Sequence, residues 1–522
     1  MPPTDRDRWR VRDLLKPPFR LDLVWLVLPF ALALICFGLL PLRSWDYWWH
    51  ISMGRLIDHW LAVPDANHFL YTIEADAPSY VQPWMSQWML FWLHDVAGVH
   101  LSLIVRNVLA ALVFGGVTVA AVRRSQSGLR GSLATLVGFL LAFQLLAART
   151  HLFVWPLFAL ALWMGYAIRR RKLPLAALVV LPAVAALWAN LHGSFFIVAA
   201  ICLAFLAAAS FDRFAGDSAT KQEISTARIA SWAGAVFASI AAPMLNPRGA
   251  EIYGYVFDLM GNAEIQNTVS EWMATTLSNP QGIGPLFYVV VVAGLVLLWK
   301  KRSQLDAADA FLFIGFGAMA AFSARSLLWF GIAAPVLLAR YIRPEQPEEA
   351  DRPGCALSVL NLFIALGLVV GGFVLQPGTT VQRNIATAYQ PLPVRTRPPM
   401  AGVALAETPV EHTEILGAYR QGVRVFHDQK YAGYLIYHLT DLQPRQVVFV
   451  DQRIELPPAD IWRQYETINT TSAWKGIFQQ YGIEAAVLSF ESQLELINRM
   501  REDDNWVLVH EDDHNALFVL EP

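Results

Sequence analysis

The sequence predicts an α-helical polytopic membrane protein with a C-terminal α/β domain outside the membrane. Three observations predict this fold class. Of the 522 residues, 55% are hydrophobic and only 16% are charged, whereas soluble domains carry roughly 25% charged residues. Apolar stretches recur up to about residue 376, and their lengths are close to the roughly 20 residues that cross a bilayer as a helix. Beyond that point the pattern changes to short alternating strand-like and helix-like segments.

About 11 transmembrane helices are expected from the apolar segments. The segments lie near 23–42, 100–122, 131–148, 152–168, 174–190, 193–211, 229–245, 284–299, 307–324, 326–339 and 355–376. The first segment follows a basic stretch, and RSWDYWW after it is no signal-peptidase site, so we expect a retained signal anchor. Residues 1–22 are then an N-terminal tail and residues 23–376 a transmembrane domain.

The distribution of Lys and Arg predicts the orientation. If the N-terminus is cytoplasmic, the connections on that side hold 22 Lys and Arg, whereas the outer connections before residue 376 hold five, all of them arginine. Cytoplasmic connections of membrane proteins carry such an excess of positive charge. The N-terminal tail 1–22 is therefore expected in the cytoplasm. Two long loops, 43–99 and 246–283, and the C-terminal domain 377–522 are expected on the extracytoplasmic side.

The first outer loop contains two helix-like stretches, 46–62 and 83–98, in which apolar residues recur at helical spacing. Tryptophan is typical of helices that lie in the headgroup layer of a membrane. We therefore expect Trp45, Trp48, Trp49, Trp84, Trp88 and Trp92 to anchor these helices at the interface, in preference to serving as stacking platforms for sugars.

The C-terminal region alternates strands with amphipathic helices. The strand-like segments are VRVFHD, QVVFVD, IEAAVLSF, NWVLVHE and ALFVLEP, and the helix-like ones are YAGYLIYHL, PADIWRQYETI, AWKGIFQQYG and SQLELINRMRE. Alternation of this kind predicts a small α/β domain with a mostly parallel sheet and a closing antiparallel hairpin.

Charge and cysteine content exclude some classes of protein. The net charge is −2, so nothing suggests a nucleic-acid partner. The three cysteines, Cys36, Cys202 and Cys355, lie in apolar segments. They form neither a disulfide framework nor a metal-binding spacing, and we expect each to be a small buried apolar residue.

The candidate functional residues all fall at the outer ends of the predicted helices. They are Asp46, His50, Arg149, His192, Arg248, Glu271 and Arg325. A charged residue within a span costs roughly 2.5–3.5 kcal/mol even on a lenient insertion scale, and Arg149 and Arg325 lie in very short connections near the membrane surface. Guanidinium groups match pairs of phosphate oxygens, and a lipid phosphate lies at the same depth. An adjacent acid such as Asp46 is placed to act as a general base on a hydroxyl.

Each candidate also has a purely structural interpretation. Asp46 could cap a helix, and His50 could hydrogen-bond within the loop. Arg149 and Arg325 could be ordinary snorkelling residues at helix ends. His192, with Asn190, could satisfy backbone groups at a tight turn, and Arg248, after Pro247, could lie in a plain turn. Asp451 and Arg453 are expected to form a local salt bridge.

Several motifs resemble one family. They are DYWWH at 46–50, PDANHFLYT at 64–72, WANLHG at 188–193 and EW at 271–272, with arginine-bearing turns at Arg149 and Arg325. With its long outer loop after the first span, the chain resembles the GT-C superfamily of polytopic glycosyltransferases, which use polyprenyl-phosphate-linked sugars, and in particular a bacterial subgroup. The resemblance covers residues 20 to about 340, and more loosely GYLIYHL and VFVDQR (448–453) in the outer domain.

The resemblance implies a function. It implies a bacterial plasma-membrane (inner-membrane) enzyme that transfers a sugar, with inversion, from a polyprenyl-phosphate donor to a glycan, lipid or protein acceptor. The first-loop acid, Asp46, would be the catalytic base, and His50, Arg149, His192, Arg248, Glu271 and Arg325 would bind substrate. Many members place a second acid beside the first, whereas Tyr47 follows Asp46 here, so a divalent metal cofactor is in doubt.

Two other functions stay open at this stage. One is a transporter or flippase, which the near absence of acidic residues within the spans disfavours. The other is a non-catalytic protein that binds a lipid-linked glycan and acts as a scaffold in a surface-polymer pathway.

Overall fold

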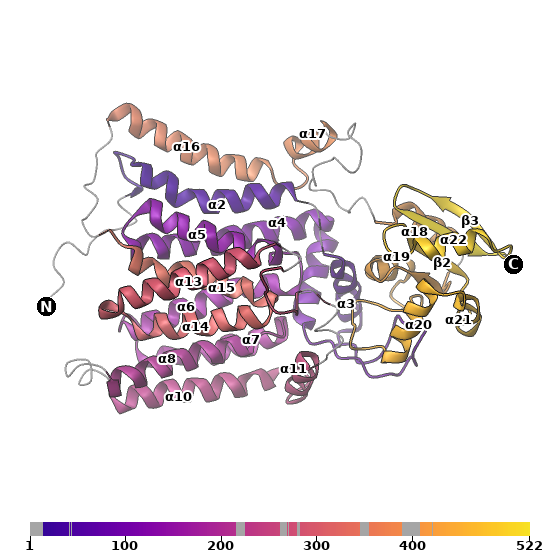
Figure 1. The fold of residues 1–522 in the computed structure, drawn as a ribbon, viewed down its shortest axis with the longest axis horizontal. Helices are drawn as coiled ribbons and strands as arrows, with labels where there is room; N and C mark the ends of the chain where they lie inside the picture. Colours follow the sequence, from indigo (N-terminus) through magenta and orange to yellow (C-terminus); the bar gives the residue numbers. More distant parts are fainter. Residues whose placement is uncertain are drawn as a thin grey trace.

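A long helical bundle and a smaller domain at one of its ends make up the protein (Figure 1). The computed structural model describes residues 14–40, 42, 44–215, 225–261, 269, 271–278, 282–344, 354–388, 408–419 and 421–521. Most of the expected N-terminal tail, residues 1–13, lies outside the described residues.

Each of the eleven predicted segments contains a helix of the bundle. These helices are α2 Leu21–Leu39, α4 Trp84–Ser125, α5 Gly128–Ala142, α6 Trp155–Arg169, α7 Val180–Leu191, α8 Phe196–Ala215, α10 Thr226–Ala241, α13 Gly284–Lys300, α14 Ala307–Phe322, α15 Leu327–Ala339 and α16 Cys355–Val374. Within the described residues, eight helical segments are long and apolar enough to cross a membrane, and three others are shorter. The multi-pass class is therefore confirmed, while the number of spans stays a prediction.

The centre of the bundle is packed through small residues. Helix α15 is apolar on all sides and lies against α4, α5 and α14. A Cβ added to Gly138 of α5 would lie 2.2 Å from the carbonyl oxygen of Gly331 in α15. Glycine at this contact lets the two helix backbones approach closely, which is the usual way in which membrane helices pack tightly.

The first outer loop folds into the two predicted helices. Helix α3 (Asp46–Trp60) is followed by an extended segment and then by the first part of α4. Helix α4 is broken at Ala97 and Gly98, and Gly98 has a φ of +64°, a conformation that residues with a side chain rarely adopt. This break separates the loop part of α4 from the part that belongs to the bundle.

The C-terminal domain has a four-stranded sheet in the order β1-β2-β4-β3. Its strands are β1 Val425–His427, β2 Ala485–Ser489, β3 Trp506–Glu511 and β4 Asn515–Leu520. Its helices are α18 Val410–Tyr419, α19 Ala432–Leu439, α20 Ala459–Thr470, α21 Trp474–Tyr481 and α22 Leu494–Arg501. The four predicted helices correspond to α19, α20, α21 and α22.

The expectation of a mostly parallel sheet is wrong for the described strands. Only β1 and β2 pair in parallel, whereas β4 pairs antiparallel with both β2 and β3. The short β3–β4 connection makes a hairpin, and β4 lies between β2 and β3. The segment QVVFVD forms only isolated bridges at Val448, to Val425 of β1 on one side and to Leu70 of the first outer loop on the other.

The first outer loop therefore docks on the C-terminal domain. Val447 N–H donates to the carbonyl of Phe69 at 2.9 Å, and Tyr71 N–H donates to that of Val448 at 3.2 Å. The α3 ring of Trp48 lies 5.3 Å from that of Tyr434 in α19. Buried in this contact, Trp48 and Trp49 do not anchor α3 in the headgroup layer, so that expectation is wrong for both residues. Trp88 and Trp92 are exposed, as an anchor requires.

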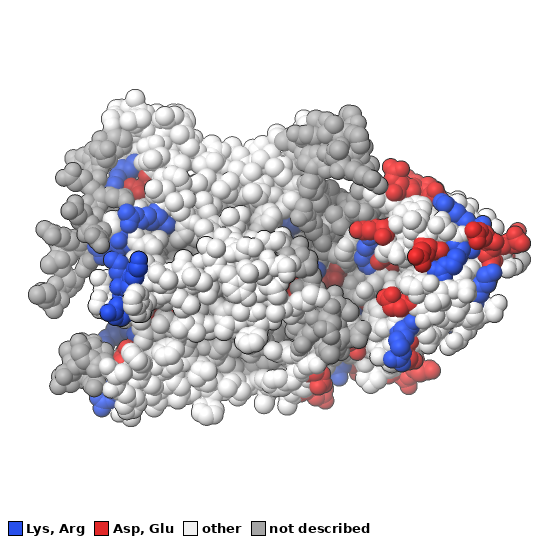
Figure 2. All heavy atoms as spheres, viewed as in Figure 1, with Lys and Arg blue, Asp and Glu red and all other residues white. Residues whose placement is uncertain are grey.

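Charge is distributed unevenly along the molecule. On the face shown in Figure 2, Lys and Arg gather at the end of the bundle far from the C-terminal domain, and the middle of the bundle is almost free of charge. The C-terminal domain carries both signs. This asymmetry agrees with the charge bias that predicts a cytoplasmic N-terminus; the orientation itself stays a prediction.

Candidate active site

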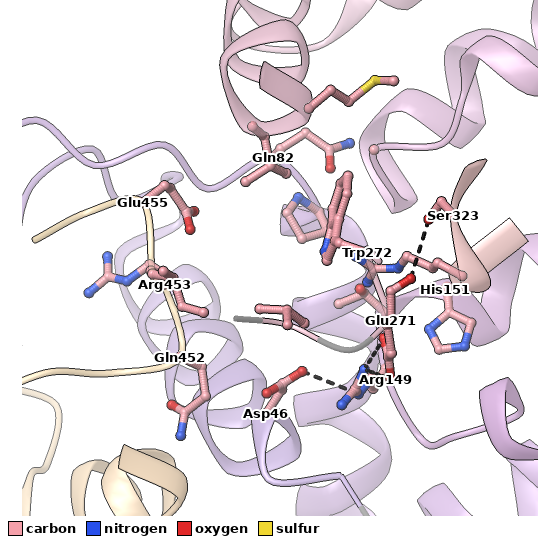
Figure 3. Close-up of a pocket in the computed structure, with 18 of the residues that line it drawn as sticks. Asp46, Gln82, Arg149, His151, Glu271, Trp272, Ser323, Gln452, Arg453 and Glu455 are labelled. Carbon is pink, nitrogen blue, oxygen red and sulfur yellow. Dashed lines mark hydrogen bonds and ion pairs between the residues drawn. The ribbon is translucent and has the colours of Figure 1, made fainter. Parts of the chain in front are cut away.

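A cavity of about 1590 Å³ lies where the outer end of the bundle meets the C-terminal domain. Its walls come from the start of α3, the short connections of the bundle, the second outer loop and the segment around Gln452 (Figure 3). Five of the predicted site residues line it together with the catalytic candidate Asp46: His50, Arg149, His192, Glu271 and Arg325. Residues from widely separated connections thus converge on one space.

Asp46 is the first residue of α3, and its side chain is 32% exposed. The helix has Trp45 at its N-cap position and no side-chain capping hydrogen bond, so the capping interpretation of Asp46 does not hold. One carboxylate oxygen, Oδ2, lies 3.2 Å from Nε of Arg149. The carboxylate is thus held at one side while still facing the cavity.

Arg149 joins two acids. It precedes the short helix η3 (Thr150–Val154), and its Nη1 donates to both carboxylate oxygens of Glu271 at 2.9 Å. Its Nε also donates to Oγ of Ser44 at 3.0 Å. Two carboxylates therefore share one guanidinium, which leaves this group of three side chains with a net negative charge (Figure 3).

Hydrogen bonds from the connection between α14 and α15 hold the backbone of Glu271 in place. Its carbonyl accepts from Arg325 N–H at 2.7 Å and from Oγ of Ser323 at 3.3 Å. Burial alone would raise the pKa of the Glu271 carboxyl, but the positive charges of Arg149 and Arg325 outweigh burial and hold this pKa below its ordinary value. Glu271 is therefore ionised at neutral pH.

Arg325 differs from Arg149 in its surroundings. It lies in the short helix η7 (Ala324–Ser326), and its guanidinium lies over the ring of Trp272 at 5.2 Å. Within the described part of the chain, this guanidinium makes no hydrogen bond or ion pair with an acidic side chain. It is thus the cation on this wall that remains available to an anionic ligand.

The histidines of the cavity are neutral at physiological pH. Burial lowers the pKa of His50 to about 4 and lowers that of His192 well below its ordinary value. Gln87 Nε2 donates to Nδ1 of His50 at 3.2 Å. His192 follows α7, and its Nδ1 accepts from the Ser194 N–H at 3.2 Å. Both rings thus also serve the structural roles considered from the sequence.

The shifted pKa of His50 predicts a pH effect on stability. The unfolded chain takes up a proton near pH 6.5, whereas folded His50 stays neutral until about pH 4. The contribution of neutral His50 to the stability of the folded state is therefore complete above pH 6.5. As the pH falls toward 4, the free energy of unfolding decreases by no more than about 1.4 kcal/mol per pH unit. Between pH 7 and pH 5, the free energy of unfolding should fall by about 2 kcal/mol more for the wild type than for His50→Gln.

Unfolding in mixed detergent micelles at the two pH values measures this difference. His59→Gln, an exposed residue of the same helix, is the matched control and should behave as the wild type. If the free energy of unfolding fell equally in His50→Gln and in the wild type between pH 7 and pH 5, His50 would not be held neutral by burial.

Arg248 is the one predicted site residue that does not line the cavity. Its Nη2 donates to the carbonyl of Ser79 at 3.2 Å, and its guanidinium lies over the ring of Tyr80 at 5.3 Å. The side chain thus packs behind the cavity wall. Asn190 is likewise structural, since its Oδ1 accepts from Nε1 of Trp84 at 2.7 Å.

His151 lies beside Arg149 in the same short connection and also lines the cavity, and its Nε2–H donates to the carbonyl of Leu145 at 2.6 Å. Sequence reasoning did not place the cavity residues of the C-terminal domain. Lys430, Gln452 and Glu455 come from the C-terminal domain. The only available signal was the VFVDQR motif, where the expected salt bridge between Asp451 and Arg453 is indeed present, with Nε of Arg453 2.9 Å from Oδ2 of Asp451.

The donor set does not fit a divalent cation between Asp46 and Glu271. Arg149 contacts both carboxylates and thus occupies the position that such a cation would need. Among the residues that the structure describes, no three or more His, Cys, Asp or Glu side chains are grouped to hold a metal ion.

Comparison with known proteins identifies the fold. No family model and no curated protein sequence matches the chain. A solved structure of ArnT from Cupriavidus metallidurans, bound to undecaprenyl phosphate, is similar with a TM-score of 0.50 and 13% identity, over 94% of this chain and 96% of that one. The oligosaccharyltransferase AglB from Archaeoglobus fulgidus, in complex with an inhibitory peptide and a dolichol-phosphate, has a TM-score of 0.49 and 13% identity, over 91% and 70%.

ArnT is a GT-C protein, and the similarity to it extends over nearly the whole of both chains. The protein is therefore a multi-pass membrane protein with the GT-C fold, as the sequence motifs predict. At 13% identity the similarity establishes the fold alone.

Proposed function

We propose that the protein is a glycosyltransferase of the bacterial plasma membrane. It would transfer a sugar from a polyprenyl-phosphate-linked donor to an acceptor on the extracytoplasmic face, with Asp46 as the general base. The observation that carries this proposal is the convergence of Asp46, the Arg149–Glu271 pair and Arg325 on one cavity. The undecaprenyl phosphate bound to the similarly folded ArnT supports a lipid phosphate as the ligand.

The lining of the cavity near the bundle suits a lipid donor. Apolar side chains of α8, α14 and the second outer loop line this part, among them Phe196, Leu259, Met319 and Phe322. Phe322 is 82% exposed on the bundle surface, as is appropriate for a side chain in contact with lipid. A polyprenyl chain would pass along these residues from the bilayer, and its phosphate would reach Arg325.

Arg325 is the stronger candidate for the phosphate contact. Arg149 already pairs with two carboxylates, so its attraction for a further anion is largely offset. A guanidinium can bind two phosphate oxygens at once. Arg325 would therefore hold the phosphate, and Arg149 with Glu271 would act as positioning residues for Asp46.

The chemistry would be a single displacement. Asp46 would remove the proton from an acceptor hydroxyl, whose oxygen would bond to the anomeric carbon of the donor sugar. The bond from that carbon to the phosphate oxygen would break, its electron pair leaving with polyprenyl phosphate. Arg325 would stabilise the charge that develops on the leaving phosphate. One displacement of this kind inverts the configuration of the anomeric carbon.

Reconstitution tests this proposal against its rivals. The full-length protein in liposomes is mixed with radiolabelled undecaprenyl-phosphate-linked hexoses and pentoses and with an extract of bacterial membranes. We expect label to move to the extract and undecaprenyl phosphate to be released. Binding of the donors without release would favour the scaffold, and movement of intact donor between leaflets would favour the flippase.

A further inference from the structure

The wall of the cavity opposite Arg149 is formed by the C-terminal domain. It consists of side chains from Asp428 and the following short helix η10 (Gln429–Tyr431), from residues 452–455 and from one face of α20. Figure 3 shows Gln452, Arg453 and Glu455 in succession along this wall, across the cavity from Arg149 and Glu271. We call this surface the outer wall. It is unlike the apolar lining near the bundle.

The charges of the outer wall are balanced. Three cationic and three anionic side chains line it, namely Lys430, Arg453, Arg463, Asp428, Glu455 and Glu466. Several of them are already paired: Nζ of Lys430 lies 2.7 Å from Oε2 of Glu491, and Tyr255 donates to Glu455 at 3.0 Å. Such a surface does not favour a strongly charged ligand.

The outer wall combines aromatic faces with planar hydrogen-bonding groups. Trp462 of α20 is held by a hydrogen bond from Nε1 to the carbonyl of Ile454 at 3.1 Å. Beside this wall, Trp45 of the first outer loop directly precedes Asp46, and its ring lies edge-on to that of Tyr431 at 5.6 Å. Nε2 of Gln452 donates to the carbonyl of Gln429 at 3.2 Å, while its buried Oε1 accepts no hydrogen bond within the described structure.

Among the described strands, none offers a free edge at this wall for a peptide to join. Peptides commonly bind by adding a strand to an exposed sheet edge. The edge next to β1 is covered by Val448, which in turn pairs with Leu70. The other edge strand, β3, lies in the part of the C-terminal domain that is far from the bundle (Figure 1). A polyhydroxylated ligand needs no strand edge, since each hydroxyl can both donate and accept a hydrogen bond.

We propose that the outer wall binds an uncharged carbohydrate, which is the acceptor of the proposed sugar transfer. Sugar hydroxyls would bind Gln452 and the carboxylates, and the apolar faces of the sugar rings would lie on Trp45 and Trp462. A sugar on Trp45 would bring one hydroxyl to the neighbouring Asp46. The acceptor role rests on the proposed function, whereas binding of the carbohydrate does not.

Ligand binding to the full-length protein in nanodiscs tests this proposal. The probes are the neutral tetrasaccharides of glucose and of N-acetylglucosamine and an uncharged tetrapeptide, observed by saturation-transfer NMR. At least one tetrasaccharide should bind saturably. Trp462→Ala and Gln452→Ala should weaken this binding at least tenfold. The matched controls Trp92→Ala and Gln443→Ala change exposed residues outside the cavity and should leave it unchanged.

Binding of undecaprenyl phosphate is measured on the same samples. Retained binding in the variants shows that they are folded. The proposal is overturned if no tetrasaccharide binds, if only the peptide binds, or if the two outer-wall variants bind sugar as tightly as their controls. If sugar binds but undecaprenyl phosphate does not, the proposed transferase function fails while the carbohydrate site stands.

Discussion

Replacing Asp46 by Asn should lower the rate of sugar transfer by about 10²- to 10⁴-fold, the usual contribution of a general base. The amide keeps the size of the side chain but cannot take a proton from the acceptor. Because the carboxylate also pairs with Arg149 at 3.2 Å, the variant should be compared with the wild type at equal amounts of folded protein. Turnover of the donor in liposomes measures the effect.

Asp58→Asn is the matched control for this experiment. Asp58 lies in the same helix, α3, and accepts a hydrogen bond from Nε1 of Trp88 at 2.8 Å, outside the cavity. An asparagine retains an acceptor there, so transfer should be unchanged. Equal activity of Asp46→Asn and the wild type would remove Asp46 from the chemistry.

Replacing Arg325 by Ala should weaken binding of undecaprenyl phosphate by about 10- to 100-fold. Hydrogen bonds to charged groups contribute about 1.5–3 kcal/mol each, and tenfold in affinity corresponds to about 1.4 kcal/mol. The Arg325 side chain makes no ion pair with the described acids and lies over the ring of Trp272. Glu271 keeps its ion pair with Arg149, so removal of Arg325 leaves no buried acid unpaired. Titration of the lipid into nanodiscs gives the dissociation constant.

Arg248→Gln serves as the comparison for Arg325→Ala. Arg248 lies in the second outer loop and was also a candidate from the sequence, but it packs behind the cavity wall on Tyr80. Its replacement should change the affinity for undecaprenyl phosphate by less than about twofold. A larger loss with Arg248→Gln than with Arg325→Ala would mean that the phosphate binds elsewhere.

The sequence was sufficient to predict the bundle, and most of the candidate residues that it suggested line the cavity at the outer end. Apolar length predicts a helix in each of the eleven segments, because a helix in lipid must satisfy its own backbone. The convergence of Asp46, Arg149, Glu271 and Arg325 was also predictable, because all four lie in connections on one side of the bundle. The pairing of Arg149 with both acids was not, because charges alone do not determine which partners meet.

Which residues of the C-terminal domain reach the cavity could not be predicted from the sequence. Trp48 and Trp49 have the composition of membrane anchors, yet their rings are buried against this domain. The local sequence does not distinguish an aromatic residue that contacts lipid from one that packs against a domain hundreds of residues away along the chain. For the same reason Gln452 and Trp462 could not be placed in the cavity, and Arg248 could not be excluded from it.

A density map of the protein with undecaprenyl phosphate, obtained by electron cryo-microscopy in nanodiscs, tests the central claim most directly. We predict phosphate density within hydrogen-bonding distance of the Arg325 guanidinium, inside the cavity that Asp46 lines. Phosphate density on the outside of the bundle or at its opposite, basic end, with this cavity empty, would contradict it.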